Sequence, residues 1–108
     1  MFHYTDDIGF KAIAAQLVWV FKAAQPPGSR PFGAYFTTLR PDTMKLAQRL
    51  RVPKSKIAFA FLFTGDGGLR AYEGGRGAYV LYSPEDYTVA KDRQVDCGST
   101  GDVAERLR

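Results

Sequence analysis

Several residue types that support specialised chemistry are scarce in this sequence. It holds one cysteine and one histidine among 108 residues. A disulfide framework needs paired cysteines, and a zinc site needs several thiolate or imidazole ligands at close spacing. No apolar run comes near the ~20 residues that cross a bilayer, and no signal peptide is visible. The sequence therefore favours neither a disulfide-rich scaffold, nor a metal centre, nor a membrane protein.

The overall composition is that of an ordinary globular chain. Apolar residues make up 45% of it and charged residues 24%, which is typical of a folded rather than a disordered protein. A chain of this length is expected to form a single domain over residues 1–108 with one thin core. The first predicted strand follows directly after Met1, which would suit a domain cut from a longer protein.

The charge balance is modestly basic, with a net charge of +4. Such a balance suits an anionic partner, for example a dinucleotide, RNA or an acidic protein. Most of the cations are scattered, but one segment gathers Arg49, Arg51, Lys54 and Lys56. A solvated basic surface explains that segment equally well. A non-catalytic module that binds RNA or protein through it is one alternative for the function.

The order of the predicted elements indicates an α+β fold. Apolar and aromatic runs bounded by turn residues predict strands over residues 2–5, 18–22, 34–38, 57–64, 78–82 and 87–90. Two helices are expected in the N-terminal half, over residues 6–16 and 41–51, and one or two frayed helical turns after residue 99. The run 57–64 is the most apolar and is expected at the centre of a mostly antiparallel sheet.

Two short segments carry polar side chains where packing alone would need apolar ones. They are His3–Thr5 and the stretch 32–37, which reads Phe-Gly-Ala-Tyr-Phe-Thr. Pairing of their strands would bring an imidazole, a hydroxyl and a phenol together in a small-molecule pocket. Taken singly, a lone histidine or a strand tyrosine has an ordinary structural role. The prediction therefore depends on the order and spacing of the segments.

In this order the segments resemble the ADP-ribosyltransferase superfamily. They are most similar to its His-Tyr-Asp/Glu branch and to the short HYD-signature domains of bacterial polymorphic toxins. Members open with a His-Tyr-Thr or His-Gly-Ser strand and a helix, then a loop ending in Arg-Phe-Gly-x-Gly, then a Tyr-Phe-Thr or Tyr-Phe-Ala strand. The matching stretches here are His3–Thr5, Arg30–Gly33 and Tyr35–Thr37, and the resemblance covers residues 2 to about 95. It implies a small, mostly antiparallel split β-sheet of the ADP-ribosyltransferase type.

The resemblance also implies a function, a mono-ADP-ribosyltransferase toxin that uses NAD as substrate, and a role for each matching residue. His3 would bond the adenosine-side ribose, the Tyr4 backbone would meet the nicotinamide amide, and Thr5 would add a hydroxyl. Tyr35 or Phe36 would stack on the nicotinamide. The other implied NAD-binding residues are Arg30 at the pyrophosphate, Phe32, Gly33 and Tyr79.

A third motif departs from the family pattern. In the family an acidic residue opens a strand of the form Glu-Tyr-Ile/Val-Val-Tyr, whereas residues 78–82 here read Ala-Tyr-Val-Leu-Tyr. Ala78 thus stands at the expected position of the catalytic acid. A carboxylate there stabilises the oxocarbenium-like ribose that forms as nicotinamide leaves, and a methyl group does not. Loss of one such group is expected to slow the reaction on the order of 10²–10³-fold.

Three interpretations of Ala78 stay open. The alanine is an inactivating replacement, or the chain is a natural pseudoenzyme, or the acid comes from Glu73, Glu85 or Asp86 in another register. The related activity is that of an NAD glycohydrolase, in which water accepts the ribose. The implied partners are NAD, a protein or nucleic-acid acceptor and a cognate immunity protein, with no metal and no membrane. The domain would be secreted or injected and would act in the target-cell cytoplasm during bacterial competition.

Overall fold

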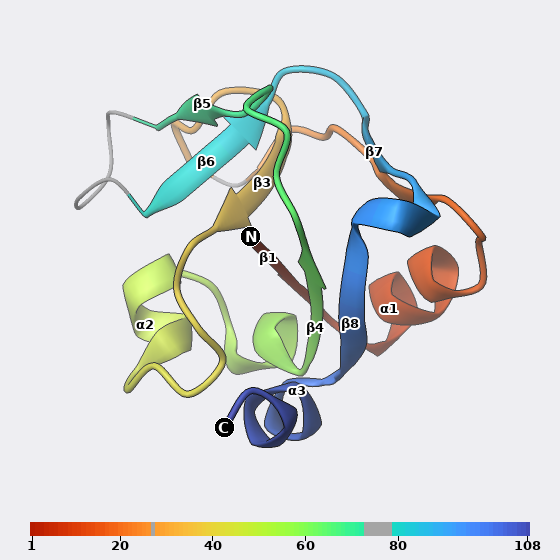
Figure 1. The fold of residues 1–108 in the computed structure, drawn as a ribbon. Helices are drawn as coiled ribbons and strands as arrows, with labels where there is room; N and C mark the ends of the chain where they lie inside the picture. The colour runs from red at the N-terminus through yellow and green to blue at the C-terminus, as the bar shows by residue number, and fades with distance from the viewer. Residues whose placement is uncertain (27, 73–78) are drawn as a thin grey trace.

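The computed structural model describes residues 1–26, 28–72 and 79–108, so Glu73 and Ala78 lie outside the described residues. Within them, one antiparallel sheet has the strand order β5-β6-β3-β1-β4-β8 (Figure 1). In that order its strands are Arg70–Ala71, Val80–Ser83, Ala34–Thr37, Phe2–Thr5, Phe59–Phe63 and Gln94–Ser99. A smaller sheet pairs β2 (Trp19–Phe21) with β7 (Tyr87–Val89). The predicted α+β class with a mostly antiparallel sheet is confirmed.

Short helices connect and flank these strands. The described part of the chain has α1 (Asp7–Ala14), α2 (Leu46–Leu50) and α3 (Thr100–Arg106), with 3₁₀ turns η1 (Lys54–Ile57) and η2 (Lys91–Arg93). Asp6 caps α1, because its Oδ1 accepts the Gly9 N–H at 2.8 Å. None of these helices has both the length and the apolar character needed to cross a membrane.

The sequence prediction was wrong at α2 and β8, and it also missed the short strand β5 and placed the start of β4 two residues too early. The helix expected over residues 41–51 begins only at Leu46, because turns precede it and Lys45 adopts a left-handed conformation with φ of 57°. The strand β8 was missed, since its sequence Gln-Val-Asp-Cys-Gly-Ser has one β-branched residue, Val95, and no aromatic one, whereas such residues usually mark a strand. It forms because β4 beside it offers an unpaired edge, with Phe59 opposite Ser99 and Phe61 opposite Cys97.

The two faces of the large sheet are covered by different elements. On one face the small sheet packs its aromatic residues against the middle strands, and α1 adds Phe10 and Ile13 at the side. The buried members of this core are Trp19, Phe21, Ala34, Phe36, Phe61, Phe63, Tyr87 and Val89. On the other face α2 contributes Leu46 and Leu50, which pack with Val80 and several tyrosines. Because alternate strand residues point to opposite faces, each strand serves both layers.

The sheet is least continuous between β1 and β3. Strand β1 pairs with β4 along all its residues, whereas its ladder with β3 is the single pair Phe2–Thr37. From that point the two strands run apart (Figure 1). The His3 ring bridges the gap, with Nδ1 2.9 Å from the carbonyl oxygen of Tyr35. Part of β3 is thus held to β1 by a side chain instead of by backbone pairing.

Candidate functional site

A cavity of about 580 Å³ opens on the face of the sheet covered by α2. This volume lies in the range of small-molecule sites. Its floor is formed by the middle strands, one wall by the chain from the end of α2 into η1, and the other by the loop that precedes β3. The floor residues are Phe2, Tyr4, Tyr35, Phe36, Thr37 and Val80. The cavity therefore lies where the β1 and β3 motifs meet.

Tyr35 presents a fixed aromatic surface to this cavity. Its ring stacks on Tyr82 at 5.5 Å between centroids, and Tyr72 meets it edge-on at 6.4 Å. Its hydroxyl donates to the Pro31 carbonyl at 2.5 Å, which fixes the ring at its far end. Burial raises the pKa of the Tyr35 phenol, so the group stays neutral at physiological pH. A flat, neutral ring in this position can stack on a planar heterocycle.

Arg30 brings a positive charge to the same wall. Its guanidinium lies 5.7 Å from the centroid of the Tyr35 ring and 5.6 Å from that of Tyr72. One of its nitrogens donates to the Leu50 carbonyl at 3.1 Å, which ties the loop before β3 to the end of α2. Its other N–H groups remain able to bind an anion, because arginine carries five donors in a planar fork.

The charges that line the cavity are all positive in the described part of the chain. Arg30, Arg51 and Lys56 line it, and no aspartate or glutamate does. Lys56 is engaged with Asp6 at 2.6 Å, which leaves the two arginines to set the local potential. Such a lining favours an anionic ligand. It also means that no described carboxylate stands ready to stabilise a cationic ribose in this cavity.

The two described residues that the sequence offered as alternative acids lie elsewhere. Asp86 accepts the Ala23 N–H at 2.8 Å. In the turn after β6, the Ser83 hydroxyl donates to the Glu85 carbonyl and accepts from the Glu85 N–H. Both acidic residues are exposed, and neither lines the cavity. Their positions fit turn-forming roles, whereas Glu73, the third alternative, lies outside the described residues together with Ala78.

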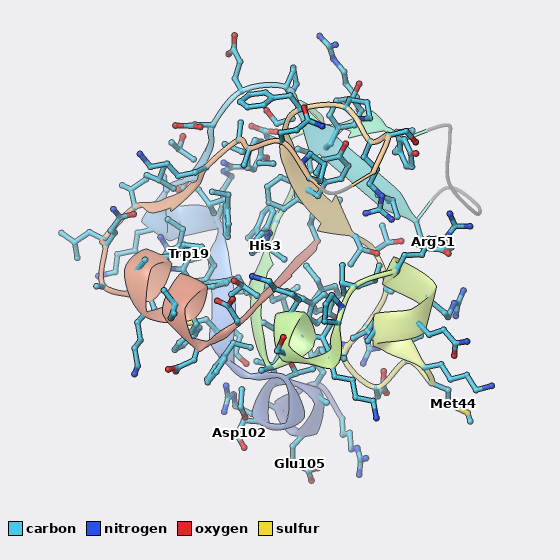
Figure 2. The ribbon with its side chains drawn as sticks, turned by 180° about the vertical axis from the view of Figure 1, so that it is seen from behind. His3, Trp19, Met44, Arg51, Asp102 and Glu105 are labelled. Atoms are coloured by element: carbon cyan, nitrogen blue, oxygen red, sulfur yellow. The ribbon has the colours of Figure 1, made fainter. Side chains whose placement is uncertain are left out.

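His3 lies on the opposite face from the cavity floor and is not among the cavity-lining residues. Its ring centroid is 4.6 Å from that of Phe21 and 5.6 Å from that of Phe36, and Figure 2 shows it in the middle of the molecule. Burial lowers the pKa of His3 to about 4, opposed in part by the bond to the Tyr35 carbonyl. Because a carbonyl only accepts, the neutral ring donates through Nδ1. His3 thus affects the cavity only indirectly, because it holds the backbone of Tyr35.

Tyr4 and Thr5 also differ from each other in position. The Tyr4 ring lines the cavity, and its hydroxyl donates to the Leu39 carbonyl at 2.6 Å. Burial, reinforced by Asp42, raises the pKa of Tyr4. Thr5 does not line the cavity and lies against α1, where a Cβ added at Gly9 would collide with the Thr5 hydroxyl. Alternation along β1 explains why three consecutive motif residues cannot share one pocket.

The remaining predicted residues divide in the same way. Phe36 touches the cavity, but its ring packs edge-on against Phe21 and Phe63 in the core, so Tyr35 is the ring available for stacking. Phe32 is 53% exposed and lies outside the lining. Gly33 is also outside it and pairs with Ala24 in a β-bridge, where a Cβ would come within 2.5 Å of the Ser83 carbonyl oxygen.

Tyr79 lies near the cavity but does not line it. Its hydroxyl donates to the Arg49 carbonyl at 3.2 Å, and the Arg49 guanidinium stands 5.2 Å above its ring. Sequence reasoning missed Tyr72 and the residues of the α2–η1 connection, which also line the cavity. No motif marks them; for Arg51 the one signal was membership of the basic segment.

Comparison with known proteins gives no match, whether to a family model, to a curated protein or to a solved structure. Within the described residues, no group of three or more histidine, cysteine, aspartate or glutamate side chains could hold a metal ion. The cavity and the motif strands that form it are therefore the features of this chain that bear on its function.

Proposed function

We propose that this chain is an NAD-binding domain of the ADP-ribosyltransferase type, whose reaction is the transfer of ADP-ribose from NAD to a macromolecule. The observation that carries the proposal is the adjacency of the three motif strands. Strands β6, β3 and β1 are consecutive neighbours in one sheet, although their motifs are far apart in the sequence. A cavity with a stacking tyrosine and two arginines opens on them.

The chemistry of the lining fits the parts of NAD. The nicotinamide is a planar ring that can stack on Tyr35, and the pyrophosphate is an anion that can bind Arg30 and Arg51. His3 fixes the backbone of Tyr35 and so acts as a positioning residue. The His3 ring therefore acts on NAD indirectly, instead of through the direct contact that the sequence predicted. Tyr4, Tyr35 and Arg30 remain in the proposed site.

The reaction breaks the bond between ribose C1′ and the nicotinamide nitrogen. Nicotinamide leaves as a neutral molecule with the electron pair of that bond, the acceptor atom bonds to C1′, and the acceptor's proton passes to solvent. Water as acceptor gives the NAD glycohydrolase reaction. With alanine at position 78, we propose that the chain binds NAD and turns it over slowly. We propose with this activity that the domain is a secreted or injected toxin and that its partner is an immunity protein.

Titration with NAD tests the proposal. We expect saturable binding in the micromolar-to-millimolar range and protection from thermal unfolding. Tyr35→Ala should weaken binding about tenfold, because an aromatic stacking partner contributes about 0.5–1.5 kcal/mol beyond the area that it buries. Phe32→Ala is the matched control, since that ring is exposed and outside the cavity. Absence of both heat and thermal protection in the unmodified protein would overturn the proposal.

A further inference from the structure

The segment from residue 43 to residue 65 carries an unusual concentration of charge. It contains five cationic residues and no acidic one. Lys56 pairs with Asp6. The other four are exposed and have no salt-bridge partner among the described residues. These four residues, Lys45, Arg49, Arg51 and Lys54, are called the basic rim below.

Elsewhere in the described chain many cations are neutralised by partners. Ion pairs join Lys11 to Asp7, Arg40 to Asp42, Arg93 to Asp66, Arg106 to Asp96 and Arg108 to Glu105. The basic rim therefore holds much of the excess behind the net charge of +4. Such a concentration creates a local field that attracts a polyanion.

The basic rim borders the candidate cavity. Arg51 belongs both to the rim and to the cavity lining, and Figure 2 shows it at the end of α2. Arg49 lies over Tyr79 just before β6, with its guanidinium 5.2 Å from the ring centroid. A strand-like ligand that follows the rim would thus pass beside the cavity mouth.

The side chains along this path combine charge with flat surfaces. Arg49 stacks over Tyr79 beside the cavity, whereas Arg30 and Tyr35 lie inside it and are assigned above to NAD. Guanidinium planes and tyrosine rings stack on unpaired nucleobases, while lysines and arginines contact the phosphates. An acidic protein would use the charge but has no comparable need for the stacking surfaces. The combination favours single-stranded nucleic acid over an acidic protein.

We infer that the basic rim docks a single-stranded nucleic acid beside the cavity and that this strand is the acceptor of ADP-ribose. The acceptor role rests on the proposed function, whereas the docking does not. In the transfer, an oxygen or nitrogen of the strand bonds to ribose C1′ as the bond from C1′ to nicotinamide breaks. The electron pair of that bond leaves with nicotinamide, and the proton of the acceptor atom passes to water.

Fluorescence anisotropy with a short labelled RNA, and with DNA of the same sequence, tests the docking. If the three rim cations that do not line the cavity each meet a phosphate, affinity should fall about 20-fold between about 50 and about 200 mM salt, since each contact contributes about 0.7 to the logarithmic slope. The double variant Arg49→Gln/Lys54→Gln should bind about 10- to 100-fold more weakly at low salt and lose about 1.4 from the slope. Binding of either RNA or DNA with this dependence supports the inference.

The matched control is Lys22→Gln/Lys91→Gln, which removes the same charge from two exposed lysines near β2 and in η2. This control should bind nucleic acid as the unmodified protein does. Equal losses in both double variants, or equally tight binding of a poly-glutamate peptide, would overturn the inference. Neither Arg49 nor Lys54 lines the cavity, so the rim variant should keep its NAD affinity. If the unmodified protein binds NAD but no nucleic acid, the docking is refuted. If it binds nucleic acid but not NAD, the proposed function is refuted.

Discussion

Replacing His3 by glutamine is expected to remove much of the acid sensitivity of this fold between pH 7 and pH 4. The chain has one histidine, and burial against aromatic rings lowers its pKa to about 4. In the unfolded chain its pKa returns to about 6.5. The unfolded state therefore binds a proton in a pH range where the folded state does not. The contribution of His3 to stability is complete above the unfolded pKa and declines as the pH falls toward the folded pKa.

The size of the effect follows from these two pKa values. Linkage between proton binding and folding gives a loss of about 2 kcal/mol between pH 7 and pH 5, and about 3 kcal/mol by pH 4. Below the folded pKa the loss is constant, because both states are then protonated. Glutamine does not titrate, and its amide can donate to the Tyr35 carbonyl, which His3 contacts at 2.9 Å. The variant is therefore expected to lack this component of the pH dependence while keeping a donor at the position.

Urea unfolding at several pH values measures the difference between the two proteins. Every other titrating group is common to both, so the pH dependence of the difference in unfolding free energy isolates His3. We expect the variant to become more stable relative to the unmodified protein as the pH is lowered from 7 to 4. A difference that stays constant over this range would refute the burial of a neutral imidazole and, with it, the positioning role of His3.

Two further predictions address the packing of α3 and the identity of the missing acid. Val103 is fully buried where α3 meets the sheet, so Val103→Ala should lower the unfolding free energy by about 2 kcal/mol. Val95→Ala, at a site 59% exposed on β8, should change it by less than about 0.5 kcal/mol, and equal losses in urea unfolding would contradict the assigned packing. Ala78→Glu should raise nicotinamide release from NAD on the order of 10²–10³-fold and make expression toxic, whereas Ala78→Gln should not. If the glutamate variant neither consumes NAD nor harms the host, the assignment of position 78 or of the family is wrong.

Local sequence patterns determined several parts of the fold and the site. The strand β4 and the helix α1 were both predicted, because apolar runs and helical spacing act over a few residues. Tyr4, Arg30 and Tyr35 were predicted site residues and do line the cavity. The order of the motifs was sufficient to predict a pocket where β1 and β3 lie side by side.

Only the tertiary structure decided which face of the sheet each motif residue occupies. Alternation places His3 and Tyr4 on opposite faces, but it does not say which face becomes the core. That choice comes from the small β2–β7 sheet and α1, which cover the His3 side, while α2 leaves a cavity on the Tyr4 side. The places of Tyr72 and Arg51 depend on the same long-range packing. Contacts between residues far apart in the sequence set these positions, and no local pattern encodes them.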